Sequence, residues 1–224
     1  MTEEVPSVAV ADDCAPQLYA CRTRVSKNDA DGSPTVGVGA SYVSDALLKA
    51  TLTPNYDPGT EVKEVNGCGS NFINVPGKPS LVRGDLTLEF LTPDPYLHAI
   101  LLSGGVLLSP GSGGVGFAYP PIGPVGDESV AIELWTQRIV DGALSTVHPY
   151  AHWAIPKVTN VQLGARDFTN AAQHSLLSAT CFENANWFDG PANDFDAESD
   201  RIAQWIPAGT LPTAACGPST VVAS

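Results

Sequence analysis

Apolar and polar residues alternate with a period of two along several stretches of the chain, which is the pattern of β-strands with one buried face. The clearest example places Leu86, Leu88 and Phe90 on one face, with polar residues between them. In residues 45–56, the apolar face consists of Leu48, Ala50 and Leu52. Further strands are predicted within residues 128–140, 157–165 and 173–183.

One segment, residues 94–103, has the signals of a short α-helix instead. Asp94 is suited to cap the helix, Pro95 fits the first helical position, and Gly104 is suited to end it. A stripe of apolar side chains would pack this helix on a sheet: Leu97, Ile100 and Leu101.

These patterns predict a mainly β protein, a β-sandwich or barrel with one short α-helix and long loops or arms. The 21 glycines and 19 prolines favour many turns, and the 43% hydrophobic content supports a packed core. We expect one domain over residues 1–224 with flexible N- and C-terminal arms. The polar, Gly- and Pro-rich stretches 26–40 and 207–224 are predicted to be loops or arms.

The charge balance is acidic, with 24 Asp and Glu against 11 Lys and Arg and a formal net charge of -13. Binding to nucleic acid or to an anionic membrane needs a basic surface, so this balance argues against both. The sequence lacks a basic, apolar secretory signal at its start and a membrane-spanning apolar run. Five scattered cysteines without a C-x-x-C motif are expected to be buried or half-buried thiols, in preference to a disulfide framework or a zinc site.

The glycine-rich run at 111–116 reads G-S-G-G-V-G and fits the G-x-G-x-x-G pattern of dinucleotide-binding loops. Such a loop needs a helix directly after it, whose N-terminus faces the phosphates. The prolines and glycines that follow Gly116 prevent a helix there. We therefore predict that residues 109–124 form a loop between strands that carries no ligand, in solvent or at a subunit boundary.

Other candidate chemistry is weak, so we expect neither an enzyme nor a bound cofactor or metal. His148 and His152 have the spacing of metal ligands on a helix, but Pro149 disfavours a helix, and ordinary loop or surface histidines are favoured. The acidic run at 194–200 lacks the glycine and glutamate of a calcium loop. No motif of a nucleophile, a zinc protease or a P-loop is found.

Two blocks of the chain together resemble a known family. In residues 45–105, a strand, a "PNYDPG" turn, "NGCG", a second strand and an Asp-Pro helix start follow in order. In residues 150–196, a strand is followed by N-x-x-W-x-D-G-P, a structural turn formed by Asn184, Trp187, Asp189, Gly190 and Pro191. This order resembles the tail tube (major tail) proteins of long-tailed, non-contractile bacteriophages, especially those of actinobacteria. Residues 106–149 carry no such resemblance.

The resemblance implies a structural subunit of the virion tail, made and assembled in the host bacterial cytoplasm. Subunits of this family form hexameric rings, and the stacked rings make a hollow tube through which duplex DNA passes without specific binding. The implied partners are other copies of the chain, the tape measure protein, the tail terminator and distal tail proteins. An acidic wall suits such a conduit, because lysines and arginines would bind phosphates.

The strand pattern suggests which acids line the bore. Glu89 and Glu133 occupy polar positions of alternating strands, and Asp85 and Glu183 are further candidates. Ring closure would pair strand edges between subunits, and residues 128–140 are the candidate edge strand. Trp187 is expected to be buried and structural.

Other functions are compatible with the same patterns. A distal tail or head–tail connector protein would be another virion β-protein. A ligand- or carbohydrate-binding β-sandwich would use Trp187, Trp205 and the acidic run at 194–200. A hydrolase whose residues meet only in space is a further alternative.

Overall fold

The structure is a computed structural model of the chain that describes residues 15–69, 71–109, 113–123, 126, 128–166, 169–187, 195, 201–214 and 219–221. It confirms the mainly β class, with an antiparallel sheet of ten strands as its largest element. Two small two-stranded sheets accompany it. Among the described residues there is one α-helix, α2 (Pro95–Leu101), and one 3-10 turn, η1 (Ala185–Trp187).

The strands of the first half are β1 (Gln17–Lys27), β2 (Gly37–Ser44), β3 (Leu47–Asp57), β4 (Val62–Val65), β5 (Asn71–Val75), β6 (Ser80–Phe90), β7 (Val106–Leu108) and β8 (Gly116–Ala118). Those of the second half are β9 (Val130–Val140), β10 (Ala143–Leu144), β11 (Tyr150–Leu163), β12 (Ser175–Phe182), β13 (Gln204–Ala208) and β14 (Ser219–Val221).

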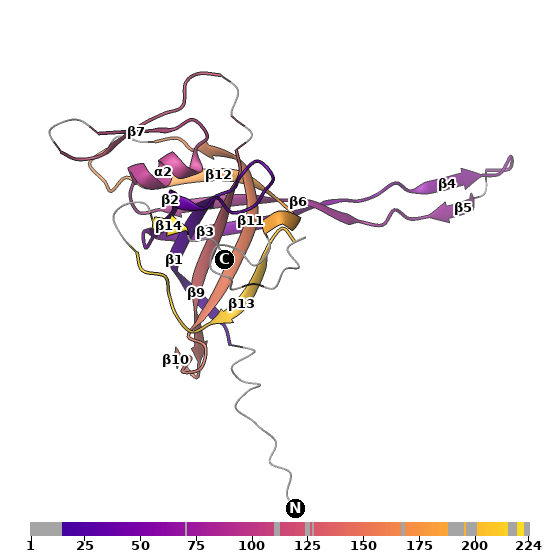
Figure 1. Cartoon of the computed structure of the whole chain (residues 1–224). Coiled ribbons are helices and arrows are strands. Elements are labelled where there is room, and N and C mark those ends of the chain that lie inside the picture. Colours follow the sequence, from indigo (N-terminus) through magenta and orange to yellow (C-terminus); the bar gives the residue numbers. More distant parts are fainter. Residues whose placement is uncertain are drawn as a thin grey trace, which may run out of the picture.

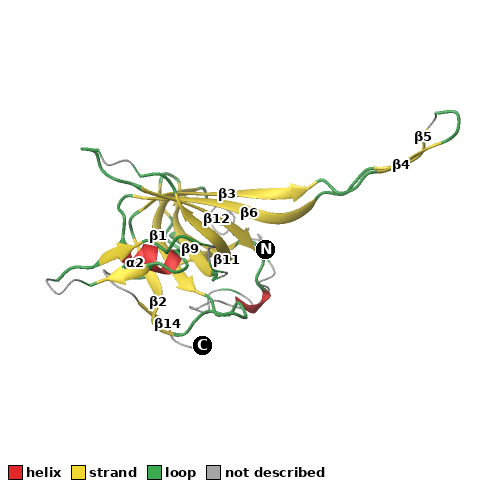
Figure 2. Ribbon diagram, turned by 90° about the horizontal axis from the view of Figure 1, so that it is seen from above, coloured by secondary structure: helices red, strands yellow, loops and turns green. Residues whose placement is uncertain are grey.

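The large sheet has the strand order β14-β2-β1-β9-β11-β12-β6-β3, with β10 and β13 beside β9 and β11. It curls so strongly that β3, at one end of the order, lies against β1 near the middle (Figures 1 and 2). Strands β3 and β6 continue out of the body as a long hairpin with β4 and β5 at its tip.

The two ends of the described strand order are β3 and β14, and β9 lies in its interior. Strand β9 is paired on one side with β1 and on the other with β11, so the prediction of an edge at residues 128–140 is wrong. Among the described strands, β3 pairs only with β6. The alternation within β9 carries no information about its neighbours, because a central and an edge strand can have the same pattern.

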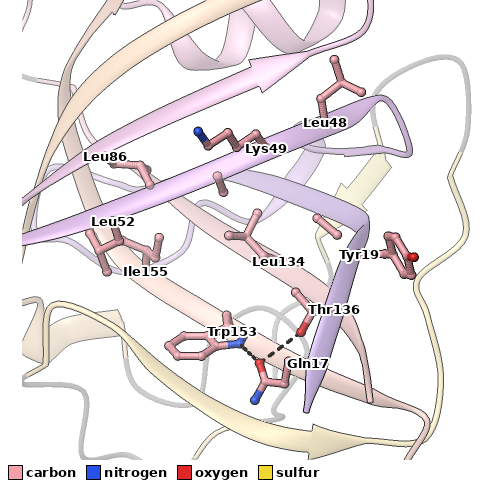
Figure 3. A pocket seen from close by; sticks show the side chains of 12 residues that line it. Gln17, Tyr19, Leu48, Lys49, Leu52, Leu86, Leu134, Thr136, Trp153 and Ile155 are labelled. Carbon is pink, nitrogen blue, oxygen red and sulfur yellow. Dashed lines mark hydrogen bonds between the residues drawn. The ribbon is translucent and has the colours of Figure 1, made fainter. Parts of the chain in front are cut away.

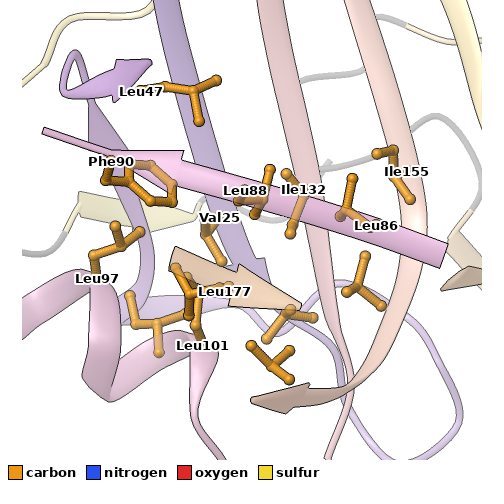
Figure 4. Packing of buried hydrophobic residues seen from close by; sticks show 14 of the residues in the cluster. Val25, Leu47, Leu86, Leu88, Phe90, Leu97, Leu101, Ile132, Ile155 and Leu177 are labelled. Carbon is orange, nitrogen blue, oxygen red and sulfur yellow. The ribbon is translucent and has the colours of Figure 1, made fainter. Parts of the chain in front are cut away.

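The main core lies inside the curl of the sheet, where the apolar faces of β6, β9, β11 and β12 meet α2 (Figure 4). The predicted inner face of β6 is confirmed, because Leu86, Leu88 and Phe90 are at most 2% exposed. Burial of each such side chain stabilises the fold by roughly 1.5–3 kcal/mol relative to an exposed position. The curled sheet therefore encloses the main core, and α2 covers one end of it.

The predicted helix is confirmed, with its end two residues earlier than expected. The carboxylate of Asp94 accepts hydrogen bonds from the amides of Tyr96 and Leu97, and Pro95 is the first helical residue. Its apolar stripe is buried in the main core, as the spacing predicts: Leu97, Ile100 and Leu101.

A second, smaller core covers the outer face of the central strands. Trp187 and Phe195 pack with Ala131 of β9 and Ala154 of β11, and all four side chains are buried. The burial predicted for Trp187 is confirmed, at 0% exposure. The chain segment after β12 thus provides the second layer, so the central strands are buried on both faces.

The turn before Trp187 is fixed by Asn184, whose side-chain amide donates to the carbonyls of Gly32 and Pro156 at 2.8 and 3.2 Å. This amide joins the loop between β1 and β2 to β11. The remaining residues assigned to the turn, Asp189, Gly190 and Pro191, lie outside the described part of the chain, as does the acidic run except Phe195.

The glycine-rich run leads into a strand. Strand β8 begins at Gly116 and pairs with β7, so no helix follows the run, as predicted. Gly113 and Gly114 have φ values of 83° and 96°, which only glycine adopts readily. Residues 110–112 lie outside the described part, and the prediction that the loop binds no ligand stays a prediction.

We expect Trp187→Ala to lower the free energy of unfolding by about 3–5 kcal/mol, because it empties a buried aromatic site. Trp205→Ala is the matched control, since Trp205 is 40% exposed and its loss should cost far less. Urea unfolding followed by circular dichroism measures both. Equal losses in the two variants would contradict the assignment of Trp187 to the second core.

Candidate functional site

The most prominent surface feature is the hairpin arm, residues 54–83, which projects from the body (Figure 1). Wherever exposure is described in the arm, every residue except Asn55 and Gly77 is exposed. The 13 residues from Pro54 to Asn66 span about 40 Å at the rise of a β-strand. A hairpin of this length has no core of its own, and isolated two-stranded hairpins are marginally stable in water.

The arm narrows where two Pro-Gly pairs face each other, Pro58–Gly59 and Pro76–Gly77. A Cβ at Gly77 would lie 2.7 Å from the carbonyl of Gly59, and one at Gly59 would lie 2.5 Å from the carbonyl of Lys78. The prolines lack the amide hydrogens that a strand ladder needs. Strand pairing is therefore interrupted at this level, and β4 and β5 form a separate tip segment.

One face of the tip segment is mainly apolar, with three apolar side chains and one glutamate. Val62 lies opposite Val75, and Glu64 lies opposite Ile73, so these four side chains share a face. Lys63 and Asn74 occupy the other. Several apolar residues of the arm are at least 37% exposed: Tyr56, Val62, Val65, Ile73, Val75, Leu81 and Val82. Exposed apolar surface of this extent is typical of protein–protein contacts.

A groove opens where the curl of the sheet fails to close, between β1 and β3 (Figure 3). It has a volume of about 530 Å³. The predicted apolar face of β3 lines one wall through Leu48, Ala50 and Leu52. Trp153 lies at the floor, where its indole NH donates to the Gln17 side chain at 2.7 Å. The alternation is correct for Ala50 and Leu52, which are partly buried against the main core, but wrong for Leu48. A bulge between Leu47 and Lys49 buries Leu47 instead and leaves Leu48 43% exposed.

Glu133 does not lie on an exposed face, so its prediction as a bore-lining acid is wrong. Its carboxylate is 1% exposed and accepts two hydrogen bonds of 2.5 Å from the Arg24 guanidinium. His152 Nε2 lies 2.9 Å from the same carboxylate, and Trp135 stacks on the His152 ring. Strand alternation predicted a polar outer face, but the C-terminal segment covers that face and turns the polar position into a buried ion pair.

The same contacts set the ionisation of this carboxyl. Burial alone would raise the pKa of Glu133, but the charge of Arg24 and the hydrogen bonds from Arg24 and His152 outweigh it and lower the pKa. The expectation of a loop or surface position is also wrong for His152, which is 1% exposed within β11. Removing one member of this network would leave a buried charge or donor without its partner.

Of the other predicted acids, Asp85 and Glu183 are exposed and Glu89 is partly exposed. Asp85 and Glu89 lie on the outward face of β6, and Glu183 is exposed just after β12. Asp85 is 3.5 Å from Arg83, and Glu89 Oε1 is 2.9 Å from His174 Nδ1. The neighbouring outward positions on β3, β6 and β12 are rich in hydroxyls: Thr51, Thr53, Thr87, Ser178 and Thr180. This polar face is hydroxyl-rich, and its acids have basic groups beside them.

One pair has the composition of a nucleophile and its base. Ser175 Oγ lies 2.7 Å from His98 Nε2, but these residues are 0% and 1% exposed, so no substrate reaches the hydroxyl from solvent. Burial, assisted by the charge of Arg166, lowers the pKa of His98 to about 4. A neutral imidazole that joins α2 to β12 is the structural role this geometry supports.

In the described part of the chain, no three His, Cys, Asp or Glu side chains lie together in a metal-binding arrangement. In that part of the chain, no helix is both long and apolar enough to span a membrane. Cys21, Cys68 and Cys181 are free thiols, as the sequence predicts. Cys21 is half-buried and Cys181 buried, but Cys68 is exposed, so the expected burial is wrong for Cys68.

No model of a known protein family matches the chain, and no curated protein matches its sequence. Among solved structures, the chain is similar to one in the cryo-EM structure of the six-fold symmetrised anti-feeding prophage (AFP) baseplate. The TM-score is 0.31 and the identity 12%, over 74% of this chain and 91% of that chain.

We expect Glu133→Gln to lower the free energy of unfolding at pH 7 by about 3–5 kcal/mol, because it breaks a buried pair. The folded pKa of Glu133 lies below its unfolded value of about 4.3, so its stabilisation is full above that value. It disappears as the pH falls through the folded pKa. The gap between wild type and variant should therefore narrow below about pH 4.

Urea unfolding at a series of pH values measures this gap. Glu89→Gln is the control, because Glu89 is partly exposed and its substitution should change stability by less than about 1 kcal/mol. A gap for Glu133→Gln that stays constant from pH 7 to pH 3 would contradict the role given to the carboxylate.

Proposed function

We propose that the chain is a structural subunit of a bacteriophage tail tube, which assembles into stacked hexameric rings around a bore for duplex DNA. The observation that carries this proposal is the hairpin arm, whose apolar residues have no partner in the described part of their own subunit. The exposed apolar side chains of such an arm would lower the solubility of a monomer. Burial of these side chains against another copy explains why the chain carries them. The order of motifs in residues 45–105 and 150–196 supports the same family.

The edges of the sheet support repeated self-association. Strand β3 presents one side without a described partner strand, and such edges are covered in stable proteins by pairing or by a neighbour. The arm and the edge are different surfaces of one chain, so contact between them is head-to-tail. Contacts of that kind form closed rings or continuous filaments.

The polar face of β3, β6 and β12 is the surface proposed for the wall of the bore. Its hydroxyls and its paired acids would let DNA pass with few phosphate contacts, since free lysines and arginines drive such contacts. In this proposal the chain carries out no chemistry and needs no cofactor. Its function is to form the tube, which depends on the shape of the subunit and on the contacts between copies.

The first test changes one face of the arm tip. We expect Val62→Asp with Val75→Asp to abolish tubes in negative-stain electron microscopy, because two carboxylates replace the apolar contact surface. Lys63→Gln with Asn74→Asp changes the charge equally on the opposite face and should retain tubes. Circular dichroism should show the same folded body in both. Tubes from the valine double variant would contradict the role of the arm.

The second test concerns the bore. We expect wild-type tubes not to retain duplex DNA at low salt, and Asp85→Lys with Glu89→Lys to make retention strong and salt-dependent. Glu128→Lys with Asp141→Lys is the control for net charge, because both residues are exposed outside the polar face. Equal DNA retention by the two variants in a filter-binding assay would show that the polar face does not line the bore.

A further inference from the structure

The groove between β1 and β3 is lined without acidic residues, in contrast to the acidic composition of the whole chain. Its twelve lining residues include no Asp or Glu, although the whole chain has 24. Lys49, at the rim, is the single charged residue among them. The groove is therefore an apolar surface with one positive charge in a strongly acidic protein. Such a surface favours the binding of an apolar segment that is flanked by carboxylates.

The two sides of the groove are strand edges. Strand β1 pairs with β9 along Gln17–Lys27, but on its other side β2 reaches only Thr23–Ser26. Residues 17–22 therefore have no partner strand on that side among the described elements. The facing edge of β3 is likewise unpaired in the described chain. A groove between two such edges, with apolar walls, has the shape and the hydrogen-bonding groups to take an extended segment.

Tyr19 stands at the rim of this groove in an unusual conformation. Its φ of 51° lies in the left-handed region, and the pairing of β1 with β9 shifts register on both sides of Ala20. Bulges of this kind redirect a side chain, and here the ring is 75% exposed. An exposed tyrosine held away from its own core is a typical anchor of protein contacts.

The N-terminal segment, residues 1–14, matches the groove. It carries Glu3, Glu4, Asp12 and Asp13 without any lysine or arginine, and Ser7–Ala11 between them reads S-V-A-V-A. This segment combines small apolar residues with flanking carboxylates, which complements an apolar groove with Lys49 at its rim. Fully extended, 14 residues reach about 45 Å.

The described chain begins beside β9. The amide of Ile139 donates to the carbonyl of Pro16 at 2.9 Å, so residue 16 continues along β9 beyond Gln17. Ala15 precedes a proline and is restricted to extended conformations, which disfavours a reversal at that point. A neighbouring copy is therefore the more accessible acceptor.

We propose that the N-terminal segment of one subunit binds as a strand in the groove between β1 and β3 of a neighbouring subunit. This inference rests on the proposed self-assembly and names one contact that produces it. The contact joins two different surfaces of the same chain, so it is head-to-tail and propagates around a ring or along a filament. Tyr19 and Leu48 at the rim hold the segment, and Lys49 attracts its carboxylates.

The first experiment compares the full chain with a chain that lacks residues 2–13. We expect the full chain to form tubes and the truncated chain to remain a folded monomer by analytical ultracentrifugation. If the truncated chain forms normal tubes, the groove contact is wrong while the tube proposal stands. If the full chain forms no tubes or rings, the proposed function itself fails.

The second experiment adds a synthetic peptide of residues 2–14, with Cys14→Ser, to the truncated chain and measures binding by fluorescence anisotropy. Leu48→Glu should weaken binding at least tenfold, because it places a carboxylate on the apolar wall. Leu176→Glu is the matched control: Leu176 is 45% exposed against 43% for Leu48, and it lies outside the groove lining. Absence of binding, or equal effects of the two variants, would overturn the proposal.

The third experiment identifies the copy that supplies the segment. Chains with Ala9→Cys and chains with Leu48→Cys, of different mass and with the native cysteines replaced by serine, are mixed and oxidised. Disulfide-linked heterodimers on a denaturing gel are the expected result. A chain that carries both Ala9→Cys and Leu48→Cys is the comparison. If it forms a disulfide within itself and the mixture gives no heterodimers, binding in a neighbouring copy is wrong.

Discussion

The central strands β1, β9 and β11 have two faces to bury, and the chain has only seven residues of described α-helix with which to cover them. The sheet therefore covers itself. Its β12-β6-β3 end curls over the inner face, and the segment after β12 packs Trp187 and Phe195 on the outer face. The groove and the arm both follow from this arrangement, because a curl that ends at β3 leaves its last edge open and lets β3 and β6 run on beyond the body.

The elements that depend on local physics could be predicted from the sequence. Asp94 and Pro95 identified the start of α2, and the alternation in β6 identified its buried face. What failed depends on contacts between distant segments. Glu133 occupies a polar position of β9, and nothing near it in the sequence shows that Arg24 and His152 will meet it under a covering layer. The edge strand was misplaced for the same reason, since pairing is a property of the sheet order.

The surfaces proposed for assembly were also only partly visible in the sequence. The sequence predicted a turn at "PNYDPG", but residues 54–57 continue β3, and β3 and β6 run out of the body together. The apolar face of β3 was identified correctly at Ala50 and Leu52 but not at Leu48, because a bulge that strict alternation does not show buries Leu47 instead. The alternation also cannot tell a core face from a groove wall. A face that is apolar in sequence and uncovered in the subunit indicates that its covering comes from elsewhere.

An open edge and an apolar arm are also hazards, because both promote unspecific aggregation. The chain limits them in recognisable ways. Prolines at 58, 76 and 79 lie where strand pairing along the arm is interrupted, and bulges at Tyr19 and next to Lys49 distort the ends of the two groove edges. The net charge of -13 keeps free subunits apart over about 8 Å at physiological salt. What remains available for regular pairing is the short stretch of β3 around Thr51, beside the groove. A strand that pairs there can adopt few registers. A repeating assembly requires one fixed register, and a short pairing stretch provides it while most of the edge stays protected from unspecific pairing.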